Sequence, residues 1–198
     1  MSKALYKAKP ADILKSNWKI YLGILAKPEG LVELFRRVYP ERGWTPDCLK
    51  EIFSNPHISA TWIARAYTTG RIHGHLSLKV EEGKPQGHWL AVDPTWRGLG
   101  IARALMHEAA KWCAIRSYST LWSWSTTVNS DVHRFFLDAN FEECPPDEAE
   151  DYQRTLHRLY SSRFDTTRLK SELAPDEALW PGEGSVVDNP HKFGSDVY

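Results

Sequence analysis

One stretch near the middle of the chain, residues 88–110, constrains the fold more than any other. A short apolar run ends at Asp93, a loop containing Gly98 and Gly100 follows, and an apolar helical pattern begins at Ile101. This order predicts a strand, a glycine loop and the first turn of a helix. The first amides of a helix have no intrahelical partner, and the helix dipole adds partial positive charge there. The loop is therefore predicted to bind a phosphate group, which glycine allows to approach the backbone closely.

The spacing around the two glycines excludes the two commonest phosphate-binding motifs. A P-loop needs Lys and Ser/Thr after its last glycine, where this chain has Ile101 and Ala102. A dinucleotide-binding loop needs a third glycine and an acidic residue about twenty residues later, and neither is present. The alternative of a tight turn without a ligand is less favoured, because a plain turn needs neither Arg97 nor the apolar strand before it.

These residues resemble the acetyl-CoA loop of the GNAT N-acetyltransferase superfamily. The motif of that family is Arg/Gln-x-x-Gly-x-Gly/Ala, and this chain has Arg97-Gly98-Leu99-Gly100-Ile101-Ala102. A second segment is also similar, because Asn129 and an apolar helix face containing Phe136 are followed by Asn140-Phe141, where the family has Gly-Phe. Asparagine can adopt the left-handed conformation that glycine usually supplies after a helix.

The resemblance implies an α/β (α+β) fold, in which helices flank a mixed, mostly antiparallel sheet that splays open. We expect one such domain over residues 1–160, followed by a tail over 161–198 that is rich in proline, glycine and acidic residues. The expected helices lie at residues 28–39, from Thr45, after the glycine loop and after Asn129; the expected strands lie at 18–26, 58–67, 71–80, 88–92, 121–125 and 152–160, with a turn at 82–85. In the strand at 71–80, alternation puts Ile72, Gly74 and Leu76 on one face.

The resemblance also implies where acetyl-CoA would bind. The pantetheine arm would pair, like an added strand, with backbone groups of Leu90, Ala91 and Val92. The pyrophosphate would lie on the amides of Arg97, Gly98, Leu99, Gly100, Ile101 and Ala102. Asn129 would contact the pantetheine arm, and Phe136 would pack on the cofactor.

The implied reaction is direct attack of a neutral amine on the thioester carbonyl, without a covalent acyl-enzyme. The usual general acid of the family is a tyrosine, but this chain has Phe136 there, which cannot donate a proton. Three explanations remain open: the thiolate departs without a dedicated acid, the domain binds acyl-CoA with little turnover, or another group substitutes. The candidates for substitution are Ser125, Thr126, Tyr118 and His133.

The general base is equally open. Some members of the family have a glutamate at about the position of Gln86, and glutamine cannot accept the proton. His88 lies two residues later, on the same strand face, and could act as a base if its pKa stayed near neutral. The favoured interpretation is that His88 is a hydrogen-bonded histidine within the sheet. Asp93 is a weaker candidate, because a carboxylate before proline more often caps a loop.

Two further pairs of side chains suggest functional hypotheses that the sequence supports only weakly. His73 and His75 share a strand face, but two possible ligands without a third are weak evidence for a metal site. Solvated or groove-lining histidines are therefore the favoured interpretation. Trp122 and Trp124 share a face of the strand at 121–125 and could line an acceptor pocket or stack on a base. Core packing is the better explanation for these tryptophans.

The composition indicates which partners and which cellular compartment to expect. Lys and Arg total 25, as do Asp and Glu, so no overall field attracts nucleic acid. We see no apolar signal core or membrane-length run, and Cys48, Cys113 and Cys144 lack metal-type spacing. The expectation is a soluble, reduced, cytoplasmic protein in which Cys113 is a packing residue.

The resemblance therefore implies an acetyl-CoA-dependent N-acetyltransferase whose partner is a small-molecule or protein amine. A nucleic-acid base or aminoacyl-tRNA is the less favoured acceptor, and a non-catalytic CoA-binding module is the second rival. The tail could dock on a partner or a second subunit.

Overall fold

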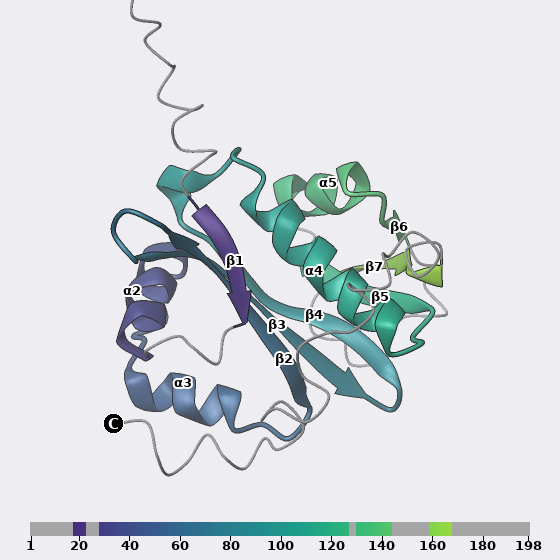
Figure 1. Ribbon diagram of the computed structural model, residues 1–198, viewed down its shortest axis with the longest axis horizontal. Coiled ribbons are helices and arrows are strands. Elements are labelled where there is room, and N and C mark those ends of the chain that lie inside the picture. The colour runs from purple at the N-terminus through teal and green to yellow at the C-terminus, as the bar shows by residue number, and fades with distance from the viewer. Residues whose placement is uncertain (1–17, 23–27, 127–129, 144–158, 168–198) are drawn as a thin grey trace, which may run out of the picture.

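The computed structural model describes residues 18–22, 28–126, 130–143 and 159–167. In these residues seven strands form one sheet in the order β1-β2-β3-β4-β5-β7-β6 (Figure 1). The strands are β1 (Trp18–Leu22), β2 (Ile58–Ala66), β3 (Ile72–Glu81), β4 (Lys84–Val92), β5 (Thr120–Thr126), β6 (Glu142–Glu143) and β7 (Leu159–Asp165). The helices are α2 (Pro28–Val38), α3 (Pro46–Phe53), α4 (Ile101–Ile115) and α5 (Ser130–Asp138), with a short 3-10 helix η2 (Pro94–Trp96).

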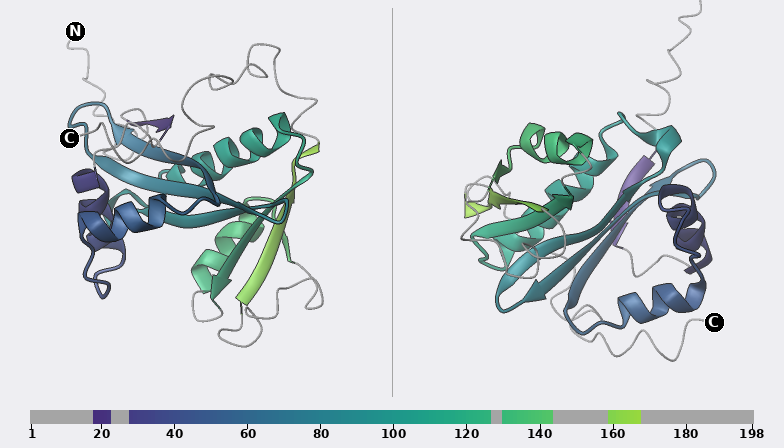
Figure 2. Two further views of the ribbon diagram at one scale, coloured as in Figure 1. Left: turned by 90° about the horizontal axis from the view of Figure 1, so that it is seen from below. Right: turned by 180° about the vertical axis from the view of Figure 1, so that it is seen from behind.

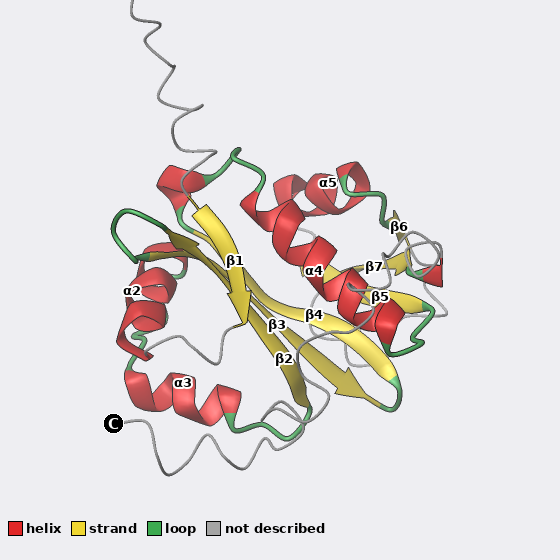
Figure 3. Cartoon of the chain, in the orientation of Figure 1, coloured by secondary structure: helices red, strands yellow, loops and turns green. Residues whose placement is uncertain are grey.

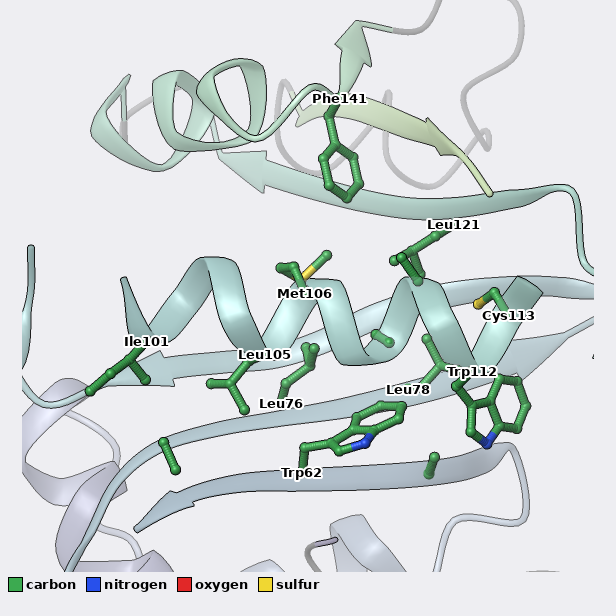
Figure 4. Packing of buried hydrophobic residues seen from close by; sticks show 14 of the residues in the cluster. Trp62, Leu76, Leu78, Ile101, Leu105, Met106, Trp112, Cys113, Leu121 and Phe141 are labelled. Atoms are coloured by element: carbon green, nitrogen blue, oxygen red, sulfur yellow. The ribbon is translucent and has the colours of Figure 1, made fainter. Parts of the chain in front are cut away.

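The helices cover both faces of the sheet and divide the core into two clusters (Figure 3). Helices α2 and α3 lie on one face, where Leu34 and Phe35 pack against Ile63 of β2. Helices α4 and α5 lie on the other face, where Leu105 packs with Leu76 in the larger cluster (Figure 4). The predicted fold class, a mixed sheet flanked by helices, is confirmed.

The sheet is splayed between β4 and β5. These strands run parallel and are joined through one residue pair, Gln86 with Trp122, whereas every other neighbouring pair of strands is antiparallel. Strands β5 and β7 stay paired along their length but diverge from β2, β3 and β4 (Figure 2). Beyond Gln86, the outer edge of β4 therefore has no strand beside it among the described residues.

Several local predictions are confirmed by the backbone. Thr45 caps α3 by accepting a hydrogen bond from the Cys48 amide, and Pro46 is the first helical residue. Asn140, which follows α5, has a φ of 64°, so it takes the left-handed conformation that glycine usually supplies. Cys113 is buried in the larger cluster, and burial raises the pKa of its thiol to about 12, as expected of a packing residue.

Two predicted boundaries are wrong. The strand that pairs with β5 is β7, Leu159–Asp165, so the pairing continues past residue 160, where the predicted strand and domain end. Residues 152–158 of the predicted strand lie outside the described residues. The turn after β3 contains only Glu82 and Gly83, both with positive φ, while Lys84 and Pro85 already pair with β3. A two-residue hairpin joins the strands because its twist matches theirs.

The predicted face of Ile72 is also wrong. Gly74 and Leu76 face α4, but Ile72 packs in the cluster under α2. The pairing of β2 with β3 shifts register between Ala64 and Arg65, opposite this point, and such an irregularity breaks the two-residue alternation.

No helix in the described part of the chain is long and apolar enough to cross a membrane.

Candidate functional site

The glycine loop connects the end of β4 to α4. Gly98 and Gly100 have φ angles of 76° and 83°, a conformation that favours glycine. A Cβ added at either position would meet no atom within 4 Å, so the described residues leave space in front of the loop. Gly100 begins α4 without a side-chain cap, which leaves the first helix amides available to an anion. The observed loop therefore fits a phosphate group.

Asp93 anchors this loop. One carboxylate oxygen accepts hydrogen bonds from the Thr95 amide and hydroxyl at 3.1 and 2.8 Å, and the other lies 2.8 Å from Nε of Arg37 on α2. His73 Nδ1 is 3.3 Å from the same second oxygen, and its ring stacks on Trp96 at 3.9 Å. Burial alone would raise the pKa of Asp93, but hydrogen bonds from Thr95 and His73 and the charge of Arg37 outweigh it and lower the pKa. Asp93 is thus a cap and an ion-pair partner rather than a base.

Backbone groups of β4 alternate between its two edges. The Asp93 amide donates to the His73 carbonyl of β3, and Ala91 pairs with His75, so Ala91 and Asp93 face β3. Leu90 and Val92 consequently face the outer edge, from which β5 diverges.

Side chains already contact this outer edge. The Tyr39 hydroxyl donates to the Leu90 carbonyl at 3.0 Å, and Arg97 Nε lies 3.4 Å from the Val92 carbonyl. Burial raises the pKa of Tyr39, which is only partly offset by the charges of Arg42 and Arg97. The amides of Leu90 and Val92 are the polar groups that this edge directs toward the splay.

Strand β4 carries a bulge at Trp89 that the sequence pattern does not predict. Trp89 has a φ of 56°, and the β3–β4 register shifts between His75 and Ser77, so one extra residue of β4 is accommodated there. A bulky residue at positive φ is rare, and no local sequence signal marks it. His75 Nδ1 lies 2.9 Å from the Trp89 carbonyl, so a buried imidazole contacts the bulge directly.

His88, the candidate base, is half-buried beside this bulge. Its ring meets the Trp89 ring edge-on, with centroids 5.4 Å apart. Burial, assisted by the charge of Lys79, lowers the pKa of His88 to about 4. The pKa of His88 is therefore not near neutral, as a general base would require, and the ring is uncharged at pH 7. Gln86, on the same strand, is buried.

The candidate acids lie in different places. Phe136 is 2% exposed and contacts Phe135 and Phe141 in the larger core cluster. Tyr118 stacks on Trp112 at the carboxyl end of α4, the end of this 15-residue helix that lies away from the glycine loop. His133 is half-buried on α5.

Several predicted site residues lie partly or wholly outside the residues that the structure describes. Ser125 and Thr126 belong to β5, but their side chains are outside the described set, as is that of Trp124. Asn129 lies outside the described residues altogether. Trp122 is half-buried on β5.

His73 and His75 are buried, so the expectation that they are solvated is wrong. Each ring contacts a specific protein acceptor, Asp93 or the Trp89 carbonyl. Within the described ranges, no group of three or more His, Cys, Asp or Glu side chains is placed to hold a metal ion.

Comparisons with known proteins agree with this architecture. The model of the acetyltransferase (GNAT) family matches residues 29–141. The ribosomal-protein-S18-alanine N-acetyltransferase from Escherichia coli has 14% identity and a TM-score of 0.58, covering 75% of this chain and 94% of that one. A GNAT family N-acetyltransferase from Escherichia coli in complex with CoA has 17% identity and a TM-score of 0.56, covering 82% and 85%.

A third solved structure is similar to the same extent. The spermidine/spermine N-acetyltransferase from Vibrio cholerae has 12% identity and a TM-score of 0.56, covering 81% of this chain and 99% of that one. No curated protein sequence matches the chain. At these identities the likeness extends to the fold alone.

Proposed function

Because the chain belongs to the acetyltransferase (GNAT) family, whose members use acetyl-CoA, we propose that it transfers an acetyl group from acetyl-CoA to an amine. The transfer proceeds by direct attack of the amine on the thioester carbonyl while both substrates are bound. The observation that supports this most is the single residue pair between β4 and β5 beside an uncapped glycine loop.

The binding roles follow from the two surfaces that meet there. The amides of Arg97 to Ala102 hold the pyrophosphate, since helix α4 adds partial positive charge at that end. The outer edge of β4 pairs with the pantetheine arm through Leu90 and Val92, while the amide and carbonyl of Ala91 are turned toward β3. Asn129 is proposed to contact the arm from the start of α5. The CoA complex of a structure with this fold supports the assignment.

The catalytic roles are assigned by protonation state. With its pKa lowered to about 4, His88 is neutral at pH 7 and orients the attacking amine by accepting a hydrogen bond. A base with this pKa takes up little proton, so the amine reaches the site already deprotonated. The thiolate leaves without a dedicated acid, because Phe136 has no proton to donate and is buried. The proton that the amine nitrogen loses as the amide forms passes to the departing thiolate, directly or through water. Ser125 of β5 is the proposed hydrogen-bond donor if one assists.

The acceptor is an amine of a small molecule or a protein. Solved structures with this fold include enzymes named for a ribosomal-protein alanine and for spermidine or spermine, so the fold by itself does not choose between these classes. An acceptor panel must include both.

Calorimetric titration with acetyl-CoA and CoA, followed by a thiol-release assay, tests the proposal. The panel contains small amines, polyamines, peptides with free N-termini, and nucleic acids. Binding with release of thiol on an amine supports the transferase. Lack of binding at micromolar protein concentration would refute the cofactor assignment.

A non-catalytic module that binds CoA is the second candidate. The buried Phe136 at the usual acid position and the low pKa of His88 favour it, since both remove proton-transfer capacity. Tight binding of acetyl-CoA without thiol release on any member of the panel would favour this candidate over the enzyme.

A further inference from the structure

We propose that His75 is a positioning residue, which holds the β4 bulge so that the outer edge of β4 presents its amides to acetyl-CoA. The inference rests on the proposed function. His75 lies on β3, fully buried, and reaches across to the Trp89 carbonyl at 2.9 Å. Its ring is enclosed by Phe35 of α2 and Phe53 of α3, with centroids 5.1 and 5.5 Å away.

The contacts of the imidazole determine its tautomer. A carbonyl oxygen only accepts, so Nδ1 must carry the proton that it donates to Trp89. Nε2 lies 3.3 Å from the Ser77 hydroxyl, and in the neutral ring it is the acceptor. The Ser77 hydroxyl is in turn 3.3 Å from that of Thr61. A chain of hydrogen bonds thus runs from β2 through β3 to the bulge in β4.

The neutral ring is consistent with its surroundings. Burial lowers the pKa of His75 to about 4, with a small further contribution from His88, so the ring is uncharged at pH 7. A protonated ring would still donate to Trp89, but its Nε2 would become a donor, and the Ser77 hydroxyl would have to turn to accept from it.

The bulge needs such support because its backbone is strained. A tryptophan at a φ of 56° is an outlier that persists only where neighbouring groups determine it. The residue after it, Leu90, is the first whose amide faces the splay. Release of the Trp89 carbonyl would let this peptide rotate and move the Leu90 amide out of line with the bound thioester arm.

Three substitutions separate positioning from packing. His75→Asn keeps a donor at the place of Nδ1 and removes Nε2. His75→Gln keeps a polar group that can reach Ser77 but lacks the Nδ1 donor. His75→Leu removes both contacts and keeps an apolar side chain in the cluster.

Calorimetric affinity for acetyl-CoA is the main readout, with the thermal midpoint of each variant measured in parallel. We expect His75→Gln and His75→Leu to bind at least roughly tenfold more weakly, and His75→Asn to stay within about threefold of the unmodified protein. Equal affinities for the Asn and Gln variants, or affinity that simply follows the thermal midpoint, would overturn the proposal.

Long-range ¹H–¹⁵N NMR of the unmodified protein supplies a readout that depends neither on the stability of a variant nor on acetyl-CoA. A neutral ring protonated at Nδ1 supports the assignment, and protonation at Nε2 overturns it. If the unmodified protein binds no acetyl-CoA, the proposed function fails. The tautomer then still decides whether His75 holds the bulge.

Discussion

The substitution Gly100→Asp tests the glycine loop most directly, with Gly100→Asn as its matched control. Both side chains have the same shape, and Asn and Asp tolerate the left-handed region better than other residues. A Cβ at Gly100 meets nothing within 4 Å, so both variants have space for the first atom of the new side chain. The two variants differ only in one negative charge placed at the start of α4.

The effect on folding is expected to be small. Adopting a φ of 83° costs a non-glycine residue about 1 kcal/mol, and a carboxylate at a helix N-terminus returns about 0.3–1 kcal/mol. The free energy of unfolding of Gly100→Asp should therefore stay within about 1 kcal/mol of that of the unmodified protein. Urea unfolding measures this.

The effect on binding is expected to be large. A carboxylate about 5 Å from a phosphate charge is repelled by roughly 1–3 kcal/mol for an effective dielectric constant between about 80 and 20. Two pyrophosphate charges give at least about 2 kcal/mol, or roughly 30-fold in the dissociation constant. We expect Gly100→Asp to bind acetyl-CoA at least roughly 30-fold more weakly than Gly100→Asn by calorimetry.

Salt provides an internal check. Raising the ionic strength shortens the range of charge repulsion, so the difference between the Asp and Asn variants should shrink. If the two variants bind acetyl-CoA equally well at low salt, with both folded, the pyrophosphate does not lie on this loop and the cofactor assignment is wrong.

Asp93→Ala is expected to lower the free energy of unfolding by about 2–4 kcal/mol in urea, because it removes a buried ion-pair acceptor and a loop cap; a loss under about 1 kcal/mol would contradict the anchoring role. Stability should also fall as the pH drops from about 6.5 toward 4, because the unfolded chain protonates His75 first while burial lowers its folded pKa to about 4. Urea titrations at several pH values should show a flatter profile for His75→Asn, and an unchanged profile would argue against a neutral buried ring. Gly74→Ala places a Cβ 2.6 Å from Ile101 and should cost about 1–3 kcal/mol in thermal unfolding. Gly87→Ala, whose Cβ makes its tightest contact with a flexible methionine end at 3.3 Å, should cost less, and the reverse order would refute the packing argument.

Features determined by neighbours in the sequence were predictable. Gly98 and Gly100 are recognisable because a tight strand-to-helix connection needs positive φ, and the structure has it at both. Asn140 could be predicted to end α5 because few residues tolerate that conformation. In each case the deciding interaction lies within a few residues, so the sequence pattern is sufficient.

Features determined by distant partners were not predictable. Trp89 takes a positive φ because β3 and β4 must shift register around it, and nothing in its own segment indicates this. Ile72 lies on the other face of the sheet from the predicted one because the pairing of β2 with β3 is irregular there. The bounds of β7 follow from its pairing with β5, residue by residue from Thr120 to Thr126. The low pKa of His88 likewise arises from burial that only the folded chain creates.

Beyond Gln86, no strand in the described part of the chain pairs with the outer edge of β4, and this affects how the protein behaves without acetyl-CoA. The Leu90 and Val92 carbonyls are contacted by Tyr39 and Arg97, but the outward amides of this edge can donate to an extended chain, and strand addition at an open edge is a usual route to aggregation. On the proposed function, acetyl-CoA takes the place of the missing strand, and at a hundred times its dissociation constant it would stabilise the fold by about 2.7 kcal/mol. The supply of acetyl-CoA would then govern the solubility and lifetime of the protein as well as its activity.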